Sequence, residues 1–263
     1  MEYFIKCEFI DLETTFNCGQ CFRWQRHDMT HQNGSYSGYA GNKRAVIRQE
    51  KSGLTMFNIK ESDIPFWKSY FCIDEDYSSL IKRFSEDPTL KKACKFAPGI
   101  RVLRQQPFET LISFIISQNN NIKRITGIIE KMCSIFGENN VFPTQAAIAR
   151  LNTDDLTAIG TGYRARYILD AANKINSGKI NLDEIQKMPY NIAREELMKI
   201  VGVGEKVADC ILLFGFHKTE AFPKDVWIKR VIAEYYPNGL PNCTKGYEGI
   251  AQQFLFHYIR NKQ

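Results

Sequence analysis

The sequence lacks the long apolar segments and the leader that membrane or secreted proteins carry. No run reaches 18 apolar residues, so no transmembrane helix is predicted. The N-terminus, MEYFIKCEFI, has neither a basic region nor a sustained apolar region, so secretion is not expected. The chain also has no internal repeat and no low-complexity linker. These absences favour an intracellular, folded protein.

Cysteine is present, but it is not arranged as in a disulfide scaffold or a zinc module. The eight cysteines are scattered over a chain of 263 residues. Cys18 and Cys21 alone form a CxxC pair, and no second CxxC or paired histidine follows at zinc spacing. Zinc at this pair is the less favoured alternative, so no metal site is predicted. Reduced thiols are the plainer interpretation.

The bulk composition excludes little by itself. A chain of this length can bury a substantial core in one or two domains. Hydrophobic residues make up 44% and charged residues 24%, which are ordinary globular values. The formal net charge of +6 leans toward polyanions, but many proteins without a nucleic-acid ligand share it.

The chain changes in texture near residue 60. Before that point, short alternating runs are separated by turn-rich pieces such as HQNGSYSGYAGNK, residues 31–43. The runs are YFIKCEFI, CFRWQRH, RAVIRQ and LTMFNI. Such runs predict a small antiparallel sheet. We expect an α+β fold, with a sheet domain over residues 1–100 and a larger, all-helical domain over residues 101–263.

Helical spacing takes over from DIPFWKSYF, at residue 63. Residues 107–137 carry a nearly continuous apolar stripe, which predicts a central buried helix followed by a second. Proline and glycine predict the breaks between helices. The breaks are expected at 87–88, 98–99, 143, 160–162, 202 and 223.

Residues 198–215, MKIVGVGEKVADCILLFG, have the form helix, glycine turn, helix. Gly202 and Gly204 permit positive φ and leave backbone N–H groups uncovered, so these groups can hold a phosphate. A tight turn without a ligand is the alternative. Lys206 stands in the first turn of the second helix, where the helix dipole disfavours a cation. It is either a solvated surface lysine or one that loses its proton easily.

Asp225 follows the break at Pro223 and precedes an apolar-periodic stretch, in FPKDVWIKRVIAEYY. A carboxylate at that place is expected to cap the N-terminus of a helix. As a cap alone it needs no further function. Its position shortly after the hairpin and Lys206 raises the odds of a joint role.

With these features, the segment resembles the helix-hairpin-helix plus Gly/Pro-rich loop and aspartate motif of base-excision DNA glycosylases. VGVGEKVADC, GYRARYI and residues 107–133 are similar, more narrowly, to the 8-oxoguanine DNA glycosylases. The matches run, with gaps, from about residue 17 to the C-terminal AQQFLF. The family often has Leu-Pro before the hairpin glycine, where this sequence has Ile200-Val201. The resemblance also implies an N-terminal sheet domain like that of the TATA-binding protein.

The resemblance implies a bifunctional enzyme that excises 8-oxoguanine and then cleaves the strand, without a required cofactor. Lys206 would attack the sugar C1′ as the base departs, and the resulting Schiff base would permit β-elimination. An amine attacks only when neutral, which desolvation and the positive helix end both favour. Asp225 would stabilise the developing oxocarbenium charge.

The resemblance also assigns residues that hold the duplex open. Asn119 would enter the space that the lesion leaves, and Arg124 would bond the widowed cytosine. Tyr163 would wedge into the duplex, with Arg164 also reading the cytosine. Backbone around the hairpin would contact DNA at Gly202, Gly204 and Val207. The alternatives are turn and cap residues at 119–121, and a helix N-terminus with exposed arginines at 163–166.

For the base pocket, the resemblance implies four residues from distant segments. Cys210, one turn after Lys206, and Phe256 would cover the two faces of the base. Gln252, four residues before Phe256, would bond the Watson–Crick edge. The Gly19 carbonyl would accept a hydrogen bond from N7–H, which 8-oxoguanine has and guanine lacks. Ordinary core packing is the alternative for Cys210 and Phe256.

Some expectations stay open at this point. The partner is expected to be duplex DNA with 8-oxoguanine opposite cytosine, bound by a monomer without a membrane, in a prokaryotic cytoplasm or a nucleus. Trp227 stands where the family often has a phosphate-contacting histidine. A monovalent cation is possible on the carbonyls of Met198, Ile200 and Val203. Another lesion, or DNA binding without catalysis, is the alternative; Cys243 alone follows Cys210, which disfavours the iron–sulfur relatives.

Overall fold

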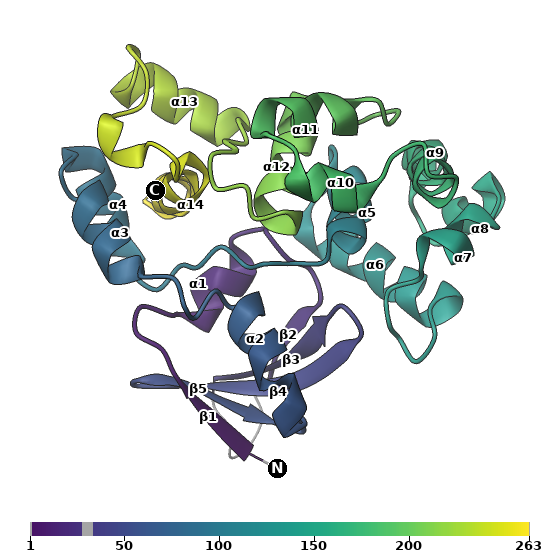
Figure 1. Ribbon diagram of the computed structural model, residues 1–263, viewed down its shortest axis with the longest axis horizontal. Helices are drawn as coiled ribbons and strands as arrows, with labels where there is room; N and C mark the ends of the chain where they lie inside the picture. The colour runs from purple at the N-terminus through teal and green to yellow at the C-terminus, as the bar shows by residue number, and fades with distance from the viewer. Residues whose placement is uncertain (1, 28–33, 263) are drawn as a thin grey trace. The chain divides into compact units, whose positions relative to one another are not determined.

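The computed structural model describes residues 2–27 and 34–262, and the chain groups into two compact units (Figure 1). Unit 1 comprises residues 1–39, 44–104 and 217–263, and unit 2 comprises residues 40–43 and 105–216. Each unit consists of segments that contact one another, so the C-terminal segment belongs to the same unit as the N-terminal segments. The domain boundary at residue 100 stays a prediction.

A five-stranded sheet lies in the N-terminal part of the chain, in the order β1-β5-β4-β3-β2 (Figure 1). Its strands are β1 (Glu2–Lys6), β2 (Trp24–His27), β3 (Ser35–Ala40), β4 (Lys43–Glu50) and β5 (Gly53–Phe57). β1 and β4 both pair antiparallel with β5, and β2 pairs antiparallel with β3. The small antiparallel sheet that the alternating runs predict is therefore confirmed, and with it the α+β class.

The prediction of turns over residues 31–43 is wrong for residues 35–40, which form β3. Its first three residues lie outside the described part of the chain. The strand was missed because it carries serine and glycine instead of β-branched residues. Packing explains the glycine: a Cβ on Gly38 would lie 2.5 Å from the Arg23 carbonyl oxygen and 2.6 Å from the Trp24 ring.

Aromatic side chains form the core beneath the sheet. The Phe16 ring, on α1 (Leu12–Asn17), stacks on Trp24 with centroids 4.6 Å apart. Trp67 and Phe71 are fully buried, and Trp67 lies on α2 (Ile64–Tyr70). The Trp24 indole N–H donates to the Tyr70 hydroxyl at 2.8 Å. Burial of several such rings supplies much of the stabilisation of this region.

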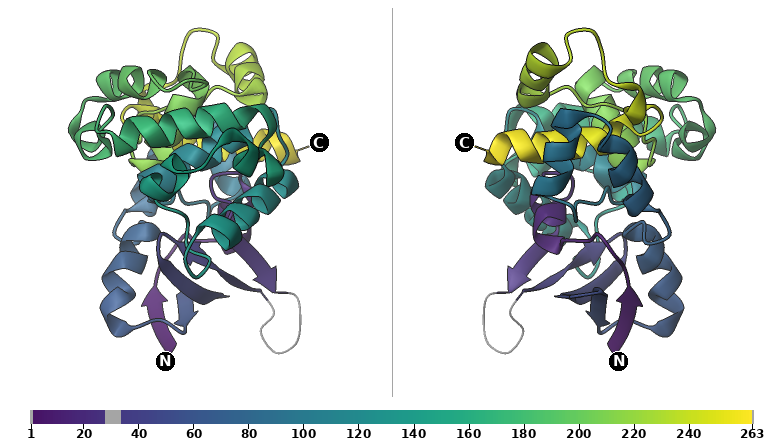
Figure 2. Two further views of the ribbon diagram at one scale, coloured as in Figure 1. Left: turned by 90° about the vertical axis from the view of Figure 1, so that its right-hand side faces the viewer. Right: turned by 90° about the vertical axis from the view of Figure 1, so that its left-hand side faces the viewer.

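The remaining elements of unit 1 are helical. They are η1 (Glu61–Asp63), α3 (Tyr77–Phe84), α4 (Pro88–Phe96), α13 (Val226–Tyr235), η3 (Asn242–Thr244) and α14 (Glu248–Asn261). α14 contacts both α4 and α13, and Figure 2 shows its yellow ribbon beside the blue one of α4. Asp87 caps α4 ahead of Pro88, at one of the predicted breaks.

Unit 2 is helical apart from its turns and the short segment 40–43. Its elements are α5 (Pro107–Ser117), α6 (Ile122–Phe136), α7 (Gln145–Ala149), α8 (Thr153–Ala158), η2 (Gly162–Arg164), α9 (Ala165–Asn176), α10 (Leu182–Lys187), α11 (Tyr190–Met198) and α12 (Glu205–Gly215). Residues 110–116 are all buried, and α5 contacts α6, α9 and α12. The predicted central buried helix is therefore confirmed. Over the described residues, no helix has the length and apolar character needed to cross a membrane.

Candidate active site

The turn between α11 and α12 contains two glycines with different structural demands. Gly202 has φ +81°, and a Cβ there would lie 2.4 Å from the Tyr167 ring. Gly204 is the N-cap of α12 with φ −96°, and a Cβ there would meet no atom of the described residues within 4 Å. The fold therefore requires glycine at 202. At 204 the missing side chain leaves the start of the helix uncovered.

Two residues of α9 hold this turn in place. The Tyr167 ring packs against Gly202, as the close approach above shows. The Asp170 carboxylate accepts a hydrogen bond from the Val201 N–H at 2.7 Å and pairs with Lys174 at 2.8 Å. The turn is thus braced from its own unit, while Val201 and Gly204 are exposed.

Lys206 lies in the first turn of α12, as predicted, and its side chain is exposed. Its ammonium lies 5.8 Å from the centre of the Phe114 ring. From Val207 to Gly215 the helix is buried. The uncapped N–H groups at the start of α12 place positive potential beside the amine. The amine therefore lies beside the start of a helix, and its side chain is exposed.

Asp225 is the N-cap of α13, as its place after Pro223 predicts. Its Oδ1 accepts a hydrogen bond from the Ile228 N–H at 2.8 Å, and the side chain is half-buried. Asp225 belongs to unit 1 and Lys206 to unit 2. Two residues on, Trp227 carries the Arg230 guanidinium 5.2 Å above its ring.

In unit 2 the structure brings together the residues predicted to hold the duplex open. Asn119 lies between α5 and α6 with φ +48°, and its Nδ2 donates to the Tyr163 hydroxyl at 3.4 Å. Tyr163 is 49% exposed, which is unusual for an aromatic ring. Arg124, also exposed, donates to the Gly160 carbonyl at 3.2 Å. Positive φ at Asn119 and the capping of α6 by Asn121 match the turn interpretation as well.

Arg164 differs from its neighbours, because it is only 3% exposed. Its guanidinium donates to the carbonyls of Gln118, Asn119 and Thr161, and it lies 4.5 Å from the centre of the Tyr163 ring. The alternative of exposed arginines is therefore wrong for this residue. These contacts hold the turn that presents Asn119, and the reading of cytosine by Arg164 stays a prediction.

The predicted pocket residues occupy both units. Cys210, in unit 2, is buried one turn after Lys206. Gln252 and Phe256 lie four residues apart on α14 in unit 1. The buried Gln252 amide donates to the Pro223 carbonyl at 3.1 Å and accepts from Gln253 at 2.6 Å. Gln252 thus supports the loop that ends at Asp225.

The loop that carries Gly19 is rigidly held. The Gln20 amide donates to the carbonyls of Thr15 at 2.9 Å and Arg101 at 2.7 Å, and accepts from the Leu103 N–H. Gly19 has φ +85°, and a Cβ there would meet no atom of the described residues within 4 Å. Backbone conformation, rather than crowding within the protein, therefore requires glycine. Burial raises the pKa of Cys18 to about 11, so its thiol stays protonated near neutrality.

Sequence reasoning passed over a buried carboxylate on α12. Asp209 is 5% exposed and accepts a hydrogen bond from the Tyr190 hydroxyl at 2.8 Å. Burial, together with this bond, raises the pKa of Tyr190 to about 12. An acidic residue inside an apolar helix was the available signal. The contact ties α11 to α12 and so holds the two arms of the hairpin.

A second group was also missed, because its members are far apart in the chain. Cys72, Glu75 and His217 bring three possible metal-ligand atoms within 4.8 Å of one another in unit 1. No spacing motif predicts it, since His217 follows Cys72 by 145 residues. All eight cysteines are buried, and none of them forms a disulfide in the described part of the chain.

Two family descriptions match nearly the whole chain. "8-oxoguanine DNA glycosylase, N-terminal domain" matches residues 3–111, and "HhH-GPD superfamily base excision DNA repair protein" matches residues 112–245. The chain belongs to the HhH-GPD superfamily of base excision DNA repair proteins. The second match contains the hairpin, Lys206 and Asp225, so the motif and the family assignment agree.

Two curated relatives and a solved structure each match most or all of the chain. The N-glycosylase/DNA lyase of Saccharomyces cerevisiae is 32% identical over 259 residues, covering 86% of this chain and 68% of the relative. That of Arabidopsis thaliana is 30% identical, covering 95% and 73%. A solved structure of the Clostridium acetobutylicum 8-oxoguanine glycosylase/lyase, with duplex DNA carrying cytosine opposite 8-oxoguanine, is 35% identical with a TM-score of 0.90. It covers all of this chain and 98% of that one.

Proposed function

We propose that this protein excises 8-oxoguanine from duplex DNA and then cleaves the strand at the abasic site, as a bifunctional DNA glycosylase and AP lyase. The observation that carries the proposal is Lys206, an exposed lysine at the uncovered start of α12. It is supported by the 35% identity to the Clostridium 8-oxoguanine glycosylase/lyase over the full chain.

Lys206 is the proposed nucleophile. Its neutral amine attacks C1′ of the sugar, the N-glycosidic bond breaks, and the base leaves with the bonding electrons. The nitrogen gives up one proton as it bonds to C1′, and the departing base takes up a proton. The sugar ring then opens at the C1′–O4′ bond, O4′ takes up a proton, and a Schiff base joins Lys206 to C1′. This makes a 2′ hydrogen acidic, so that β-elimination breaks the bond from C3′ to the phosphate oxygen. Because Lys206 is exposed, the desolvation that favours a neutral amine comes from the bound DNA.

Asp225 is the proposed partner in charge stabilisation. Its carboxylate faces positive charge that develops on the sugar as the base leaves, and it stays oriented by the bond to the Ile228 N–H. The cap therefore has two functions: it begins α13 and it keeps one carboxylate orientation. The support of the preceding loop by Gln252 serves the same positioning.

Recognition of the base is assigned to four residues. Cys210 and Phe256 stack on the faces of the flipped base, and Gln252 bonds its Watson–Crick edge. The Gly19 carbonyl accepts from N7–H of 8-oxoguanine, whereas guanine would present a lone pair there. The hydrogen bonds of Gln20 make this carbonyl a fixed acceptor.

The opposite base is assigned to the cluster of Asn119, Arg124 and Tyr163 in unit 2. Asn119 fills the vacated space and Tyr163 wedges into the stack, while Arg124 donates to cytosine. Arg124→Ala is expected to lower the preference for cytosine over the other bases by roughly 5–150-fold, as the loss of one good base contact implies. Excision ratios opposite C, T, G and A measure this. The neighbouring Lys123→Ala is the control, and unchanged ratios in Arg124→Ala would remove the assignment.

The finer features of the partner follow the same proposal. The substrate is 8-oxoguanine opposite cytosine, bound by a monomer without a membrane, in the nucleoid region or a nucleus. The phosphate sits at the hairpin, on the backbone of Gly202, Gly204 and Val207. No cofactor is required, and the carbonyls of Met198, Ile200 and Val203 are the candidate site for a monovalent cation.

The experiment is a strand-cleavage assay on matched duplexes. The duplexes carry 8-oxoguanine opposite cytosine, 3-methyladenine opposite thymine, or no lesion. We expect breaks without alkali only in the 8-oxoguanine duplex, since the lyase step cuts the strand itself. Preferred release of 3-methyladenine, or base release that needs alkali to reveal a break, would contradict the proposal.

A further inference from the structure

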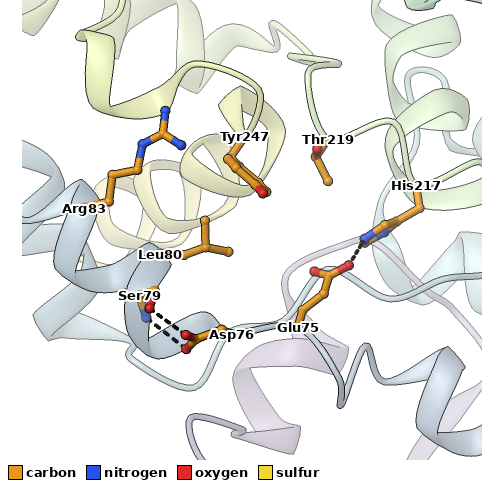
Figure 3. Close-up of a pocket in the computed structure, with 8 residues that line it drawn as sticks. All are labelled: Glu75, Asp76, Ser79, Leu80, Arg83, His217, Thr219 and Tyr247. Carbon is orange, nitrogen blue, oxygen red and sulfur yellow. Dashed lines mark hydrogen bonds and ion pairs between the residues drawn. The ribbon is translucent and has the colours of Figure 1, made fainter.

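Three side chains of unit 1 that serve no step above converge in the structure. Cys72 follows α2, Glu75 precedes α3, and His217 begins the last segment of the unit. Their ligand atoms lie within 4.8 Å of one another. Figure 3 shows Glu75 and His217 pointing toward each other beside a pocket of about 400 Å³.

The geometry is convergent rather than that of a proton relay. His217 Nε2 lies 2.5 Å from Glu75 Oε1 and 3.9 Å from Cys72 Sγ. In a catalytic triad the nucleophile and the carboxylate contact different ring nitrogens. Here both contact the same nitrogen, so the imidazole cannot pass a proton between them. Three donor atoms of these types within 4.8 Å of one another are instead compatible with metal ligands.

Two atoms of the group are left without partners. Glu75 Oε2 and His217 Nδ1 are buried, and neither has a hydrogen-bond partner among the described residues. Buried polar atoms without partners are rare in folded proteins, and an ion bound by the group can satisfy the Glu75 oxygen, whereas one imidazole offers a single ion only one of its two nitrogens. Cys72 and His217 also have φ +51° and +53°, which costs energy for side chains of this kind.

We propose that Cys72, Glu75 and His217 bind a zinc ion, with solvent from the adjoining pocket as the fourth ligand. Thiolate, imidazole and carboxylate together are a zinc donor set, and three protein ligands with one open position are a known zinc arrangement. The nearby Asp76 carboxylate is occupied by Ser79, which leaves the fourth position to solvent.

The charges are compatible with a divalent ion. Zinc takes the place of the Cys72 thiol proton, which is released to solvent, and the thiolate and the Glu75 carboxylate neutralise the ion. Because zinc displaces this proton, binding weakens as the pH falls. Arg104 holds Glu75 Oε1 at 2.6 Å and orients the carboxylate, as outer partners of metal ligands do.

The site would join segments that are distant in the chain. The loop 72–75 and the segment that begins at His217 would be linked within unit 1. That segment continues to the cap at Asp225 and to α14. The ion would therefore stabilise unit 1, and its loss would lower stability before it affects chemistry.

Zinc and cobalt binding to the full chain test the proposal. Protein treated with chelator is dialysed against zinc chloride, and zinc is measured by mass spectrometry after gel filtration. We expect one zinc per chain, and a melting temperature higher by about 5 °C at saturation. With cobalt chloride, a near-ultraviolet thiolate-to-cobalt band is expected.

Matched variants separate this site from adventitious binding. Cys72→Ser and His217→Asn should lose the metal and the cobalt band; asparagine suits the positive φ at 217. Cys94→Ser is the control, because Cys94 is equally buried and burial also raises its pKa to about 12. Circular dichroism checks that each variant folds. Less than about a tenth of an equivalent of zinc in the wild type, or an unchanged cobalt band in Cys72→Ser, would overturn the site.

Discussion

The hairpin in unit 2 and the Cys72–Glu75–His217 group in unit 1 are built in opposite ways. The hairpin residues Gly202 to Cys210 lie within nine consecutive positions, and Lys206 is exposed at the start of a helix. The three donors are buried or half-buried and come from segments up to 145 residues apart. A site for DNA must be open until the ligand arrives, whereas donors for a small ion can be enclosed in advance. The hairpin could be predicted from the sequence because its residues are consecutive and its lysine is exposed at the start of a helix.

Gly202 is required for the conformation of the hairpin turn, and its replacement should have the largest effect on stability. Gly202→Ala adds a left-handed alanine and a contact with the Tyr167 ring at 2.4 Å, so the free energy of unfolding should fall by about 2–4 kcal/mol. Urea denaturation measures it. Gly178→Ala is the matched control, with φ +75° and open space, and should cost about 1 kcal/mol. Equal losses would show that the packing against Tyr167 is unimportant.

The Cys72–Glu75–His217 group should make the stability of the protein depend on pH, through the Glu75 carboxylate. Burial alone would raise the pKa of Glu75, but the bond from His217 and nearby charges outweigh it and lower the pKa below the usual 4.5. A depressed carboxylate pKa stabilises the fold above that value, and the contribution disappears as pH falls through the folded-state pKa. Glu75→Gln, in chelator, should cost about 1–2 kcal/mol at pH 7 and progressively less as the pH falls below 4.5. A loss that does not change with pH would exclude the ionic role.

Replacement of Gly204 should have the smallest effect on stability, although Gly204 lies in the same turn as Gly202. Gly204→Ala has ordinary φ and open space, so the free energy of unfolding should change by no more than about 0.5 kcal/mol. DNA affinity should nevertheless fall roughly tenfold, because the methyl group would cover the N–H groups that we propose hold a phosphate. Fluorescence anisotropy with a labelled duplex measures this. Unchanged affinity would mean that the phosphate binds elsewhere.

Much of the fold and the site could be predicted where the signal is local. The buried helix 107–117, the breaks at proline and glycine, and the cap at Asp225 all follow from neighbouring residues. Strand β3 could not be predicted in this way, because its glycine is required by the close approach of the Trp24 ring on the neighbouring strand β2. The burial of Arg164 could not either, because its partners belong to the turn at 118–119. The Cys72–Glu75–His217 group could not be predicted either, because its members are far apart in the sequence and form no spacing motif.

Reductive trapping tests the central claim most directly. With borohydride and a duplex carrying 8-oxoguanine opposite cytosine, a Schiff base is reduced to a stable covalent adduct. We expect an adduct on Lys206 in the wild type and in the Lys199→Gln variant, which replaces a neighbouring exposed lysine. Lys206→Gln should bind the duplex and yield at least about 100-fold less adduct. An equal yield from Lys206→Gln would exclude Lys206 as the nucleophile, because another amine would then form the adduct.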